Sequence, residues 1–368
     1  MIKGKIAVSQ KDVSRAHMNR ILSDTALDWS SREVTENISL YALEIKRAAI
    51  TSCFIPIDLE KSEMYLDQTY AEVQAYFRMI PVITNDDFEL NVPMGEFKVG
   101  KYVLIGGSSD MNWFHWILNW TPRITLVALL FPELIGDKNV KFLFHSAVNT
   151  DAFKSWARAL GIDDVQMEFI DPDETSFYEN LIVPAFPFQK VYFQKLLQEH
   201  RTQIYKSLKY EDDIESPARI WISRQNLNGE KRRIANFDEI MPVLNEFGIE
   251  PVVLDGMPFD KLLRMFAKAE FVVGTHGAGL CNLILCAPRT KVLIIENERN
   301  IWLKLSGLFA TLATVAQLDT QMLSADEEIL PDSDYSQWGI LHNRNFLMDA
   351  DKLRAALNLC FSQLAIGN

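Results

Sequence analysis

The stretch FVVGTHGAGLCNLILCAP, Phe271 to Pro288, decides how the second half of this chain folds. Apolar residues run into three glycines within six positions, and an apolar segment with helical spacing follows. A buried strand that turns tightly into a helix has this pattern. In a parallel sheet, ligands bind outside the carboxyl ends of the strands, which is where this turn would lie. The stretch therefore predicts both a strand–helix unit and a ligand site.

Further strand and helix patterns alternate on both sides of this stretch. Strands are predicted at 218–224, 250–254, 270–274 and 290–296, and helices at 238–248, 259–269, 279–287 and 302–316. Because these strands are apolar on both faces, they predict a parallel sheet covered by crossover helices. The second half of the chain is therefore predicted to be a Rossmann-like α/β domain.

The first half of the chain repeats this alternation less regularly. Strands are predicted at 101–107, 140–145 and 165–170, and helical segments at 112–131, 151–161 and 189–208. The acidic stretch KYEDDIESPAR, residues 209–219, is typical of a domain boundary. We therefore expect one domain over 1–210, with short strands and one or two helices in residues 1–95, and a second over 211–345. Residues 346–368 are expected to form a C-terminal helix that packs back on the first domain.

The composition is that of a globular protein and excludes several classes. A length of 368 residues exceeds the roughly 250–300 at which one hydrophobic core stops growing, so two domains are expected. The formal net charge of −12 argues against a nucleic-acid binder, which needs clustered Lys and Arg. The four scattered cysteines are typical of buried thiols in a reducing compartment. Since no signal peptide and no long apolar run is found, we expect a cytoplasmic protein without a transmembrane segment.

The glycines of the quoted stretch indicate what the turn binds. Gly274, Gly277 and Gly279 have the spacing G-x-x-G-x-G, which differs from the dinucleotide fingerprint, and no lysine follows as in a P-loop. An NAD enzyme and a kinase-like ATPase are therefore disfavoured. Amide groups at the start of the next helix, and glycines without a Cβ atom, favour an anion such as a diphosphate. The alternative is that the glycines serve only to make a tight turn.

Four stretches, in this order along the chain, resemble one known family. GTHGAGLCN, residues 274–282, followed by a strand that ends in Glu296, resembles the signature of glycosyltransferase family 61, the DUF563 group. The upstream stretches that resemble this family are NWFHWILNWTPRI (112–124), WISRQNLNGEKRRIANFDEI (221–240) and FDKLLRMFAKAEFVVG (259–274). The resemblance extends over residues 102–297. Cys281 and Arg289 depart from it, since a threonine and a glycine are usual there.

The resemblance implies a GT-B-like fold, in which two Rossmann-like domains face each other across a cleft. It also implies an inverting glycosyltransferase that needs no metal and no other cofactor. The implied donor is a nucleotide-sugar, usually a UDP-sugar, bound by the C-terminal domain, so that the N-terminal domain forms the acceptor side. The implied acceptor is a glycan or polysaccharide, as in bacterial members linked to capsular polysaccharide biosynthesis. Peripheral association with the inner membrane face suits this class, and the oligomeric state is left open.

Metal-independent transfer needs cationic and amide donors for the departing diphosphate. Arg224 follows a predicted strand and Arg232 lies eight residues later, so both are candidate phosphate ligands. His276 is a candidate for donor binding or for a hydrogen bond to a carbonyl of the turn. Glu296 is a candidate acceptor for a ribose hydroxyl, or a simple acid at a strand end. The remaining residues of the predicted donor site are Gly274, Gly277, Ala278 and Gly279.

Inverting transfer also needs a base that takes the proton of the acceptor hydroxyl. His115 is the favoured candidate because histidine titrates near neutral pH, and Asp110 is the rival. The alternative for His115 is a core histidine. Asn112, Trp116 and Arg123 are predicted to lie on the acceptor side or to orient this helix, and phosphate contact is a second interpretation of Arg123. The tryptophans of this helix suit either a sugar-stacking platform or one buried helix face.

Two further hypotheses stay open at this point. Asp171 with Asp173, and Asp332 with Asp334, have the D-x-D spacing of metal-dependent sugar transferases, although both pairs are more typical of solvated loops. A catalytically silent nucleotide- or glycan-binding module would keep the same fold as the enzyme. A Rossmann-type methyltransferase is disfavoured, because no glycine loop is found in an early strand–helix unit.

Overall fold

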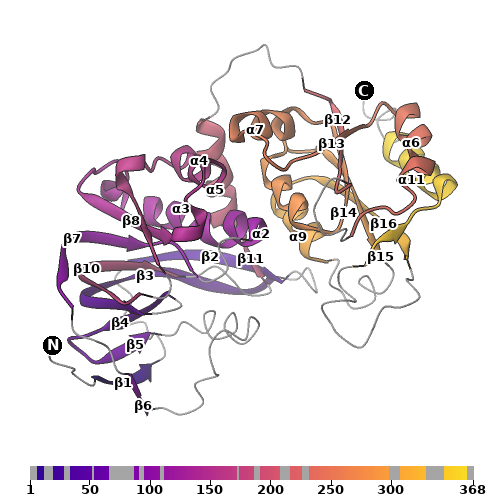
Figure 1. Cartoon of the computed structure of the whole chain (residues 1–368). Helices are drawn as coiled ribbons and strands as arrows, with labels where there is room; N and C mark the ends of the chain where they lie inside the picture. The colour runs from indigo at the N-terminus through magenta and orange to yellow at the C-terminus, as the bar shows by residue number, and fades with distance from the viewer. Residues whose placement is uncertain are drawn as a thin grey trace. The chain divides into compact units, whose positions relative to one another are not determined.

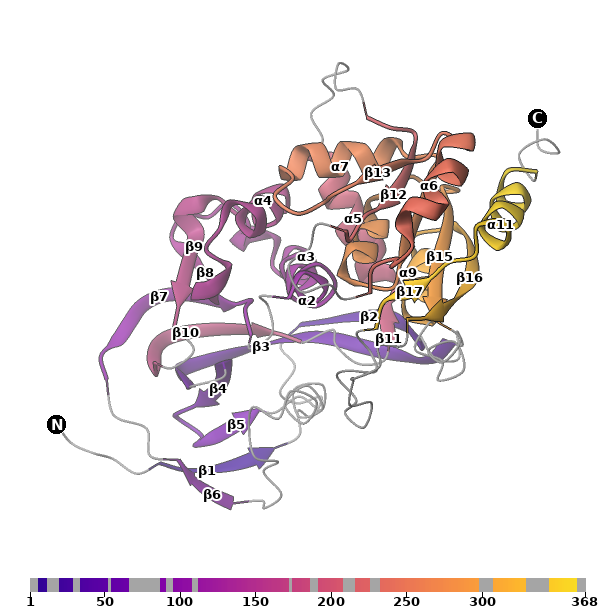
Figure 2. The same cartoon turned by 45° about the vertical axis from the view of Figure 1, so that its right-hand side comes forward.

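The computed structural model divides the chain into two compact units (Figures 1 and 2). Unit 1 comprises Met1–Leu27 and Val34–Ser207, and unit 2 comprises Leu208–Asn368 together with Asp28–Glu33. The structure describes residues 6–11, 20–28, 34–51, 54–65, 87–90, 95–107, 112–171, 174–185, 191–207, 216–225, 232–297, 307–328 and 344–362.

Unit 2 is built on a six-stranded sheet with the order β13-β12-β14-β15-β16-β17. The strands are β12 (Arg219–Ile222), β13 (Glu250–Val252), β14 (Phe271–Thr275), β15 (Lys291–Asn297), β16 (Asp319–Glu327) and β17 (Phe346–Leu347). All neighbours pair in parallel except β17, which pairs antiparallel with β16. The predicted parallel α/β sheet is therefore confirmed, and β16 and β17 add to the strands that the sequence predicts.

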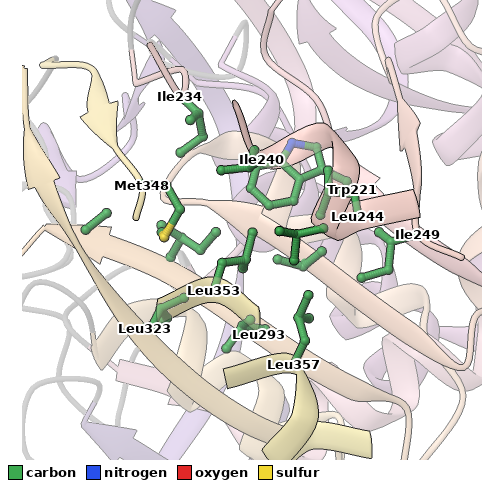
Figure 3. Packing of buried hydrophobic residues seen from close by; sticks show 14 of the residues in the cluster. Trp221, Ile234, Ile240, Leu244, Ile249, Leu293, Leu323, Met348, Leu353 and Leu357 are labelled. Atoms are coloured by element: carbon green, nitrogen blue, oxygen red, sulfur yellow. The ribbon is translucent and has the colours of Figure 1, made fainter. Parts of the chain in front are cut away.

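Helices cover both faces of this sheet. Figure 1 shows α6 (Phe237–Glu246) and α11 (Ala350–Ser362) on one face, and α7 (Phe259–Lys268) and α9 (Gly307–Val315) on the other. On the first face, side chains of the strands and of α6 form a buried apolar cluster, which includes Trp221, Leu293, Leu323, Ile240 and Leu244 (Figure 3). Full burial of one such side chain stabilises the fold by about 1.5–3 kcal/mol, so this cluster fixes α6 on the sheet.

The C-terminal helix α11 uses its apolar face within unit 2. Leu353, Leu357 and Cys360 are buried in the same cluster as the strands and α6. The sequence predicts that residues 346–368 pack on the first domain. The structure corrects this for the apolar face of α11, which packs within unit 2. The amphipathic pattern shows that a helix buries one side, but it does not show against which partner.

Unit 1 is built on an eleven-stranded mixed sheet. Its strands are β1 (Ile6–Lys11), β2 (Arg20–Asp28), β3 (Val34–Thr51), β4 (Ile55–Asp58), β5 (Glu63–Tyr65), β6 (Asp87–Leu90), β7 (Phe97–Leu104), β8 (Val140–His145), β9 (Met167–Ile170), β10 (Ser176–Pro184) and β11 (Val191–Phe193). Strands β10, β7, β8 and β9 are parallel neighbours, whereas β3 pairs antiparallel with β10, β2 and β4. The α/β prediction is thus confirmed here too, with an antiparallel extension that the sequence does not predict.

The helices of unit 1 pack on one another, and α3 lies beside the strands β3 and β10 (Figure 2). They are α2 (Trp113–His115), the π-helix η3 (Trp116–Trp120), α3 (Thr121–Leu130), α4 (Asp151–Ala159) and α5 (Gln194–Lys206), with short 3-10 turns at Pro132–Leu134, Ser146–Val148 and Asp164–Gln166. The helical segment predicted at 112–131 is confirmed, but a π-helix interrupts it. Such interruptions widen a helix by one residue and are frequent at functional sites.

A buried histidine joins two of these helices. His200 of α5 has no exposed surface, and its Nε2 and Nδ1 atoms lie 3.2 and 2.8 Å from the hydroxyl groups of Thr121 and Thr125 on α3. Its ring is stacked on Trp156 at 6.3 Å. Burial lowers the pKa of His200 to about 3, so the ring is neutral when the protein is folded.

This neutral histidine makes stability depend on pH. The unfolded chain protonates His200 below about pH 6.5, whereas the folded chain does so only below about pH 3, so stability falls as the pH drops between these values. The slope is about 1.4 kcal/mol per pH unit. We expect His200→Gln, which cannot titrate, to lose about 2 kcal/mol less than the parent protein between pH 7 and pH 5 in urea unfolding. Equal losses in both proteins would contradict this assignment.

The turn between η7 (Ala278–Leu285) and β15 places Arg289 in a conformation that favours glycine. Pro288 and Arg289 are the central residues of a turn closed by a 3.1 Å hydrogen bond from the Thr290 amide to the Ala287 carbonyl. Arg289 has φ +68°, as the third residue of a type II turn requires. The family resemblance leads one to expect a glycine at this position, and a glycine would adopt this backbone conformation without strain.

Arg289→Gly should therefore stabilise unit 2. The left-handed conformation costs a non-glycine residue about 1–2 kcal/mol, and the greater freedom of glycine in the unfolded chain offsets part of the gain. We expect the free energy of unfolding to rise by about 0.5–1 kcal/mol. Arg289→Ala keeps the backbone cost and serves as the control. A stabilisation by alanine equal to that by glycine would assign the effect to charge.

Candidate functional site

The carboxyl ends of three neighbouring parallel strands bring predicted residues to one edge of the unit 2 sheet. Strand β14 lies between β12 and β15, with Ile222 opposite Gly274 and Thr275 opposite Ile295. Arg224 comes two residues after β12, and His276 comes directly after β14. Glu296 is the last residue but one of β15. The structure therefore places these three predicted residues at the ends of adjacent strands.

The glycines of the turn make room for the protein's own side chains. A Cβ atom on Gly277 would lie 2.4 Å from Nη1 of Arg224, and one on Gly279 would lie 2.9 Å from Cγ2 of Ile222. One on Gly274 would lie 3.2 Å from Cβ of Ile222. The φ of Gly277 is 165°, an extended conformation open to any residue. The interpretation that these glycines make room for an anion is therefore corrected: they admit Ile222 and the guanidinium group of Arg224.

The segment after the glycines is a 3-10 helix, η7, and not the predicted α-helix. Within the described part of the chain, the amide groups of Ala278 and Gly279 at its start have no hydrogen-bond acceptor, while the amide of Leu280 donates to the Gly277 carbonyl. The buried thiol of Cys281 donates to the Ala278 carbonyl. A threonine hydroxyl can make the same bond, which explains how cysteine replaces the usual threonine here.

His276 and Glu296 form a buried pair across β14 and β15. Nδ1 of His276 donates to Oε2 of Glu296, and the backbone amide of His276 donates to the Ile295 carbonyl at 3.0 Å. Oε1 of Glu296 accepts from the Asn297 amide at 3.1 Å. The edge of the His276 ring packs on Phe309, with 5.0 Å between the ring centroids. These contacts fix the orientation of the imidazole at the strand edge.

Glu296 is not placed to accept a ribose hydroxyl. Its side chain has no exposed surface, and both of its carboxylate oxygens accept hydrogen bonds within the protein. This part of the sequence interpretation is corrected. The carboxylate holds His276 and interacts electrostatically with Arg232.

Arg224 and Arg232 form a cationic pair at the same edge. Burial and the neighbouring charge of Arg232 lower the pKa of Arg224 to about 10. Burial also lowers the pKa of Arg232, and the nearby Glu296 opposes this shift. The buried Nε atom of Arg232 has no hydrogen-bond partner among the residues that the structure describes. Two desolvated guanidinium groups beside one carboxylate leave net positive charge, which is the electrostatic setting of an anion site.

In unit 1, His115 and Asn112 lie at the start of the helical segment. The side chain of Asn112 caps this segment by accepting from the Phe114 amide at 3.0 Å. Nδ1 of the buried His115 lies 2.7 Å from Oδ1 of Asn119, four residues later in the π-helix. An amide oxygen accepts, so Nδ1 of His115 carries the proton and Nε2 carries the basic lone pair. Asp110, the rival base, lies outside the described residues.

Burial keeps His115 neutral. It lowers the pKa of His115 below the ordinary histidine value, while the hydrogen bond to Asn119 opposes the shift. Asn119 is a residue that the sequence analysis missed. The four-residue spacing from His115, which places two side chains on one helix face, is the signal that could have found it.

Two predicted acceptor-side residues belong to the core of unit 1. Trp116 is 1% exposed and packs against Phe144 and Phe153, so it cannot stack on a sugar. Arg123 is fully buried and donates to the carbonyls of Ile105, at 3.0 Å, and Pro184, at 2.7 Å. Phosphate contact by Arg123 is therefore excluded in this fold. Its orienting role is the interpretation that these bonds favour, since they tie α3 to the ends of β7 and β10.

The described residues form neither a metal-binding group nor a membrane-spanning helix. Within the ranges that the structure describes, no three His, Cys, Asp or Glu side chains come together as a metal-binding group. Asp173, Asp332 and Asp334 lie outside those ranges. In the same part of the chain, no helix has both the length and the apolar character needed to cross a bilayer.

Comparison with solved structures finds distant similarities. One is to the bacterial iron-containing dodecameric glycosyltransferase TibC from enterotoxigenic E. coli H10407, at 11% identity and a TM-score of 0.38, covering 97% of this chain and 98% of that one. TibC in complex with ADP-D-beta-D-heptose gives 12% identity and a TM-score of 0.35, covering 76% and 80%. The E. coli heptosyltransferase WaaC with ADP-2-deoxy-2-fluoro heptose gives 9% and 0.26, covering 54% and 89%.

Comparison with protein families gives a more specific result. No curated protein sequence matches the chain. The family model Glycosyltransferase 61 matches residues 113–293, which include the π-helix segment of unit 1 and the glycine turn of unit 2. The resemblance derived from the sequence motifs is thereby confirmed, and the chain is a glycosyltransferase that carries the family 61 region.

Proposed function

We propose that the chain is an inverting, metal-independent glycosyltransferase of GT-B arrangement. It moves a sugar from a UDP-sugar to a hydroxyl group of a glycan or polysaccharide. The observation that carries this proposal is the cationic edge of the unit 2 sheet, where Arg224, Arg232 and His276 meet. The UDP moiety, the inversion and the assignment of the acceptor to capsular or other surface polysaccharides rest on the family resemblance.

The cationic edge supplies what a departing diphosphate needs. The guanidinium groups of Arg224 and Arg232 can each donate two parallel hydrogen bonds to phosphate oxygens. The amide groups of Ala278 and Gly279 add two neutral donors at the start of η7. Since the arginines already lie desolvated in the unbound protein, little reorganisation is needed when the leaving group becomes more negative.

His276 complements these donors through its bond to Glu296. The buried carboxylate accepts the Nδ1 proton and so holds the imidazole at the strand edge. The imidazole is thereby available as a polar group for a phosphate oxygen or a sugar hydroxyl of the donor. Glu296 determines where the imidazole points.

His115 is proposed as the base that activates the acceptor. Because Asn119 holds the proton on Nδ1, Nε2 is the atom that takes the acceptor proton. The acceptor oxygen then forms a bond to the anomeric carbon as the bond from that carbon to the diphosphate oxygen breaks. The diphosphate leaves with the electron pair, and attack from the opposite face inverts the configuration.

Nucleotide binding and product analysis test the proposal as a whole. UDP and UDP-sugars should raise Tm more than ADP, GDP or CMP, and transfer should persist in EDTA. The product of a donor panel should have the anomeric configuration opposite to that of the donor. A Tm rise with another nucleotide alone would overturn the choice of UDP, and loss of activity in EDTA would overturn metal independence. Nucleotide binding without transfer or donor hydrolysis would favour a silent binding module.

Arg224→Met should separate ligand binding from stability. Removal of charged hydrogen bonds should weaken UDP binding roughly 10- to 100-fold. The unbound protein should be as stable as the parent or more so, because a desolvated cation beside Arg232 is removed. Calorimetry with UDP and urea unfolding measure the two effects.

Arg219→Met is the matched control for this variant. Arg219 begins the same strand β12, donates to the Phe247 carbonyl at 2.7 Å and stacks on Phe361. Its loss should lower stability and leave UDP affinity unchanged. The reverse pattern, with Arg224 stabilising the fold and not affecting UDP, would contradict the donor site.

His115→Ala should abolish catalysis without weakening donor binding. Loss of a general base lowers kcat roughly 100- to 10,000-fold, and UDP affinity should stay at the parental value. Because burial lowers the pKa of His115, the acid limb of the parental kcat/KM profile should lie below about pH 6.5. Asn119→Leu should reduce kcat less than His115→Ala does. Equal losses of kcat and UDP affinity in His115→Ala would show a structural role instead.

A further inference from the structure

The backbone of Arg232 is held in an uncommon conformation from one side by strand β14. Arg232 has φ +58°, in the left-handed region that an arginine rarely adopts. Its carbonyl oxygen accepts from the hydroxyl of Thr275, the last residue of β14, at 2.9 Å. An uncommon conformation of this kind persists only where surrounding contacts determine it. Thr275 provides the first of these contacts.

The C-terminal strand β17 holds the same segment from the other side. The amide of Phe346 donates to the Arg233 carbonyl, and the amide of Ala235 donates to the Phe346 carbonyl, both at 2.8 Å. Ile234 thereby forms a parallel bridge with Phe346. Since β17 also pairs with β16, it links the segment 232–236 to the edge of the sheet.

Two asparagine side chains complete this link. Oδ1 of Asn345 accepts from the Arg233 amide at 3.3 Å, and its Nδ2 donates to Glu328 at 2.8 Å. Asn236 donates to the Met348 carbonyl at 2.9 Å and accepts from the Met348 amide at 3.0 Å. Figure 3 shows the side chains of Ile234 and Met348 together at one end of the apolar cluster.

These contacts join residues more than 100 positions apart in the chain at the cationic edge. The segment 232–236 carries one functional candidate, Arg232, whose charge interacts with Arg224 and Glu296. A glycine at 232 would adopt the same backbone without strain but would have no guanidinium group. The contacts therefore hold a charged side chain where the backbone alone would favour glycine.

We propose that Thr275 and the C-terminal segment Asn345–Met348 are positioning elements of the donor site, which set Arg232 for contact with the diphosphate of the nucleotide-sugar. The inference rests on the proposed function, because it assumes that Arg232 binds the donor. Thr275 and Asn345 act through the backbone of residues 232 and 233 and do not themselves touch the ligand.

A double-mutant cycle on UDP affinity tests this inference in the full chain. Thr275→Val removes the hydroxyl at nearly constant volume, and Arg232→Met removes the guanidinium group. We expect Thr275→Val to weaken UDP binding about tenfold in the parent protein and to have no effect in the Arg232→Met background. Thr275→Ser keeps the hydroxyl, so this variant should bind UDP with parental affinity. Asn345→Ala should show the same dependence on Arg232.

Thr290→Val is the matched control. The hydroxyl of buried Thr290 donates to the Ala269 carbonyl at 3.0 Å, next to the amino end of β15 and away from the carboxyl edge. This variant should lose stability as Thr275→Val does but keep parental UDP affinity in both backgrounds.

The outcomes distinguish a failure of the proposed donor site from a failure of the positioning role alone. If Arg232→Met binds UDP normally, the assignment of Arg232 to the donor site fails, and the positioning role fails with it. If Arg232→Met weakens binding but Thr275→Val weakens it equally in both backgrounds, the donor site stands and the positioning role alone is overturned. A loss of affinity in Thr290→Val equal to that in Thr275→Val would also overturn it, since general destabilisation would then explain the effect.

Discussion

Two desolvated guanidinium groups close together are the constraint around which the carboxyl edge of unit 2 is organised. Arg224 and Arg232 repel each other, and burial removes the water that would weaken this repulsion. One fully buried carboxylate, Glu296, compensates only part of the charge. The arrangement is therefore better suited to a bound dianion than to an empty site. Gly277 leaves room for the guanidinium group of Arg224, and the hydroxyl of Thr275 bonds the backbone carbonyl of Arg232.

The two units place their histidines in opposite electrostatic settings. In unit 2, His276 donates to a buried carboxylate, which suits a ring that faces an anion. In unit 1, His115 bonds the neutral amide of Asn119, and burial keeps its ring uncharged. A residue that must accept a proton has to be neutral before the reaction, whereas a residue that stabilises a departing diphosphate gains from positive character. The partner of each ring thus agrees with the role proposed for it.

The sequence predicts the strands and the site edge better than it predicts side-chain roles. Buried strands such as β14 and β15 have continuous apolar runs, so the edge with Arg224 and His276 could be located. Strand β10 was missed because a bulge beside the polar residues Glu179 and Asn180 interrupts its pattern, and β17 is only two residues long. The pairing of His276 with Glu296 depends on register between strands, which a linear pattern does not contain. For Trp116, helical spacing alone does not distinguish a tryptophan of the buried core from one that stacks on a sugar.

The glycine spacing marks a strand edge for a physical cause different from the one that the motif suggests. In the dinucleotide fingerprint, glycines allow a ligand to approach the backbone. Here the space at Gly277 is taken by Arg224 and the space at Gly279 by Ile222. The turn therefore brings a side-chain cation to the strand edge and leaves the amide groups of η7 beside it. The guanidinium groups of Arg224 and Arg232 then supply most of the positive charge, and the contacts of residues 232–236 bear on the position of Arg232 alone. This explains why contacts as distant as β17 belong to the same site.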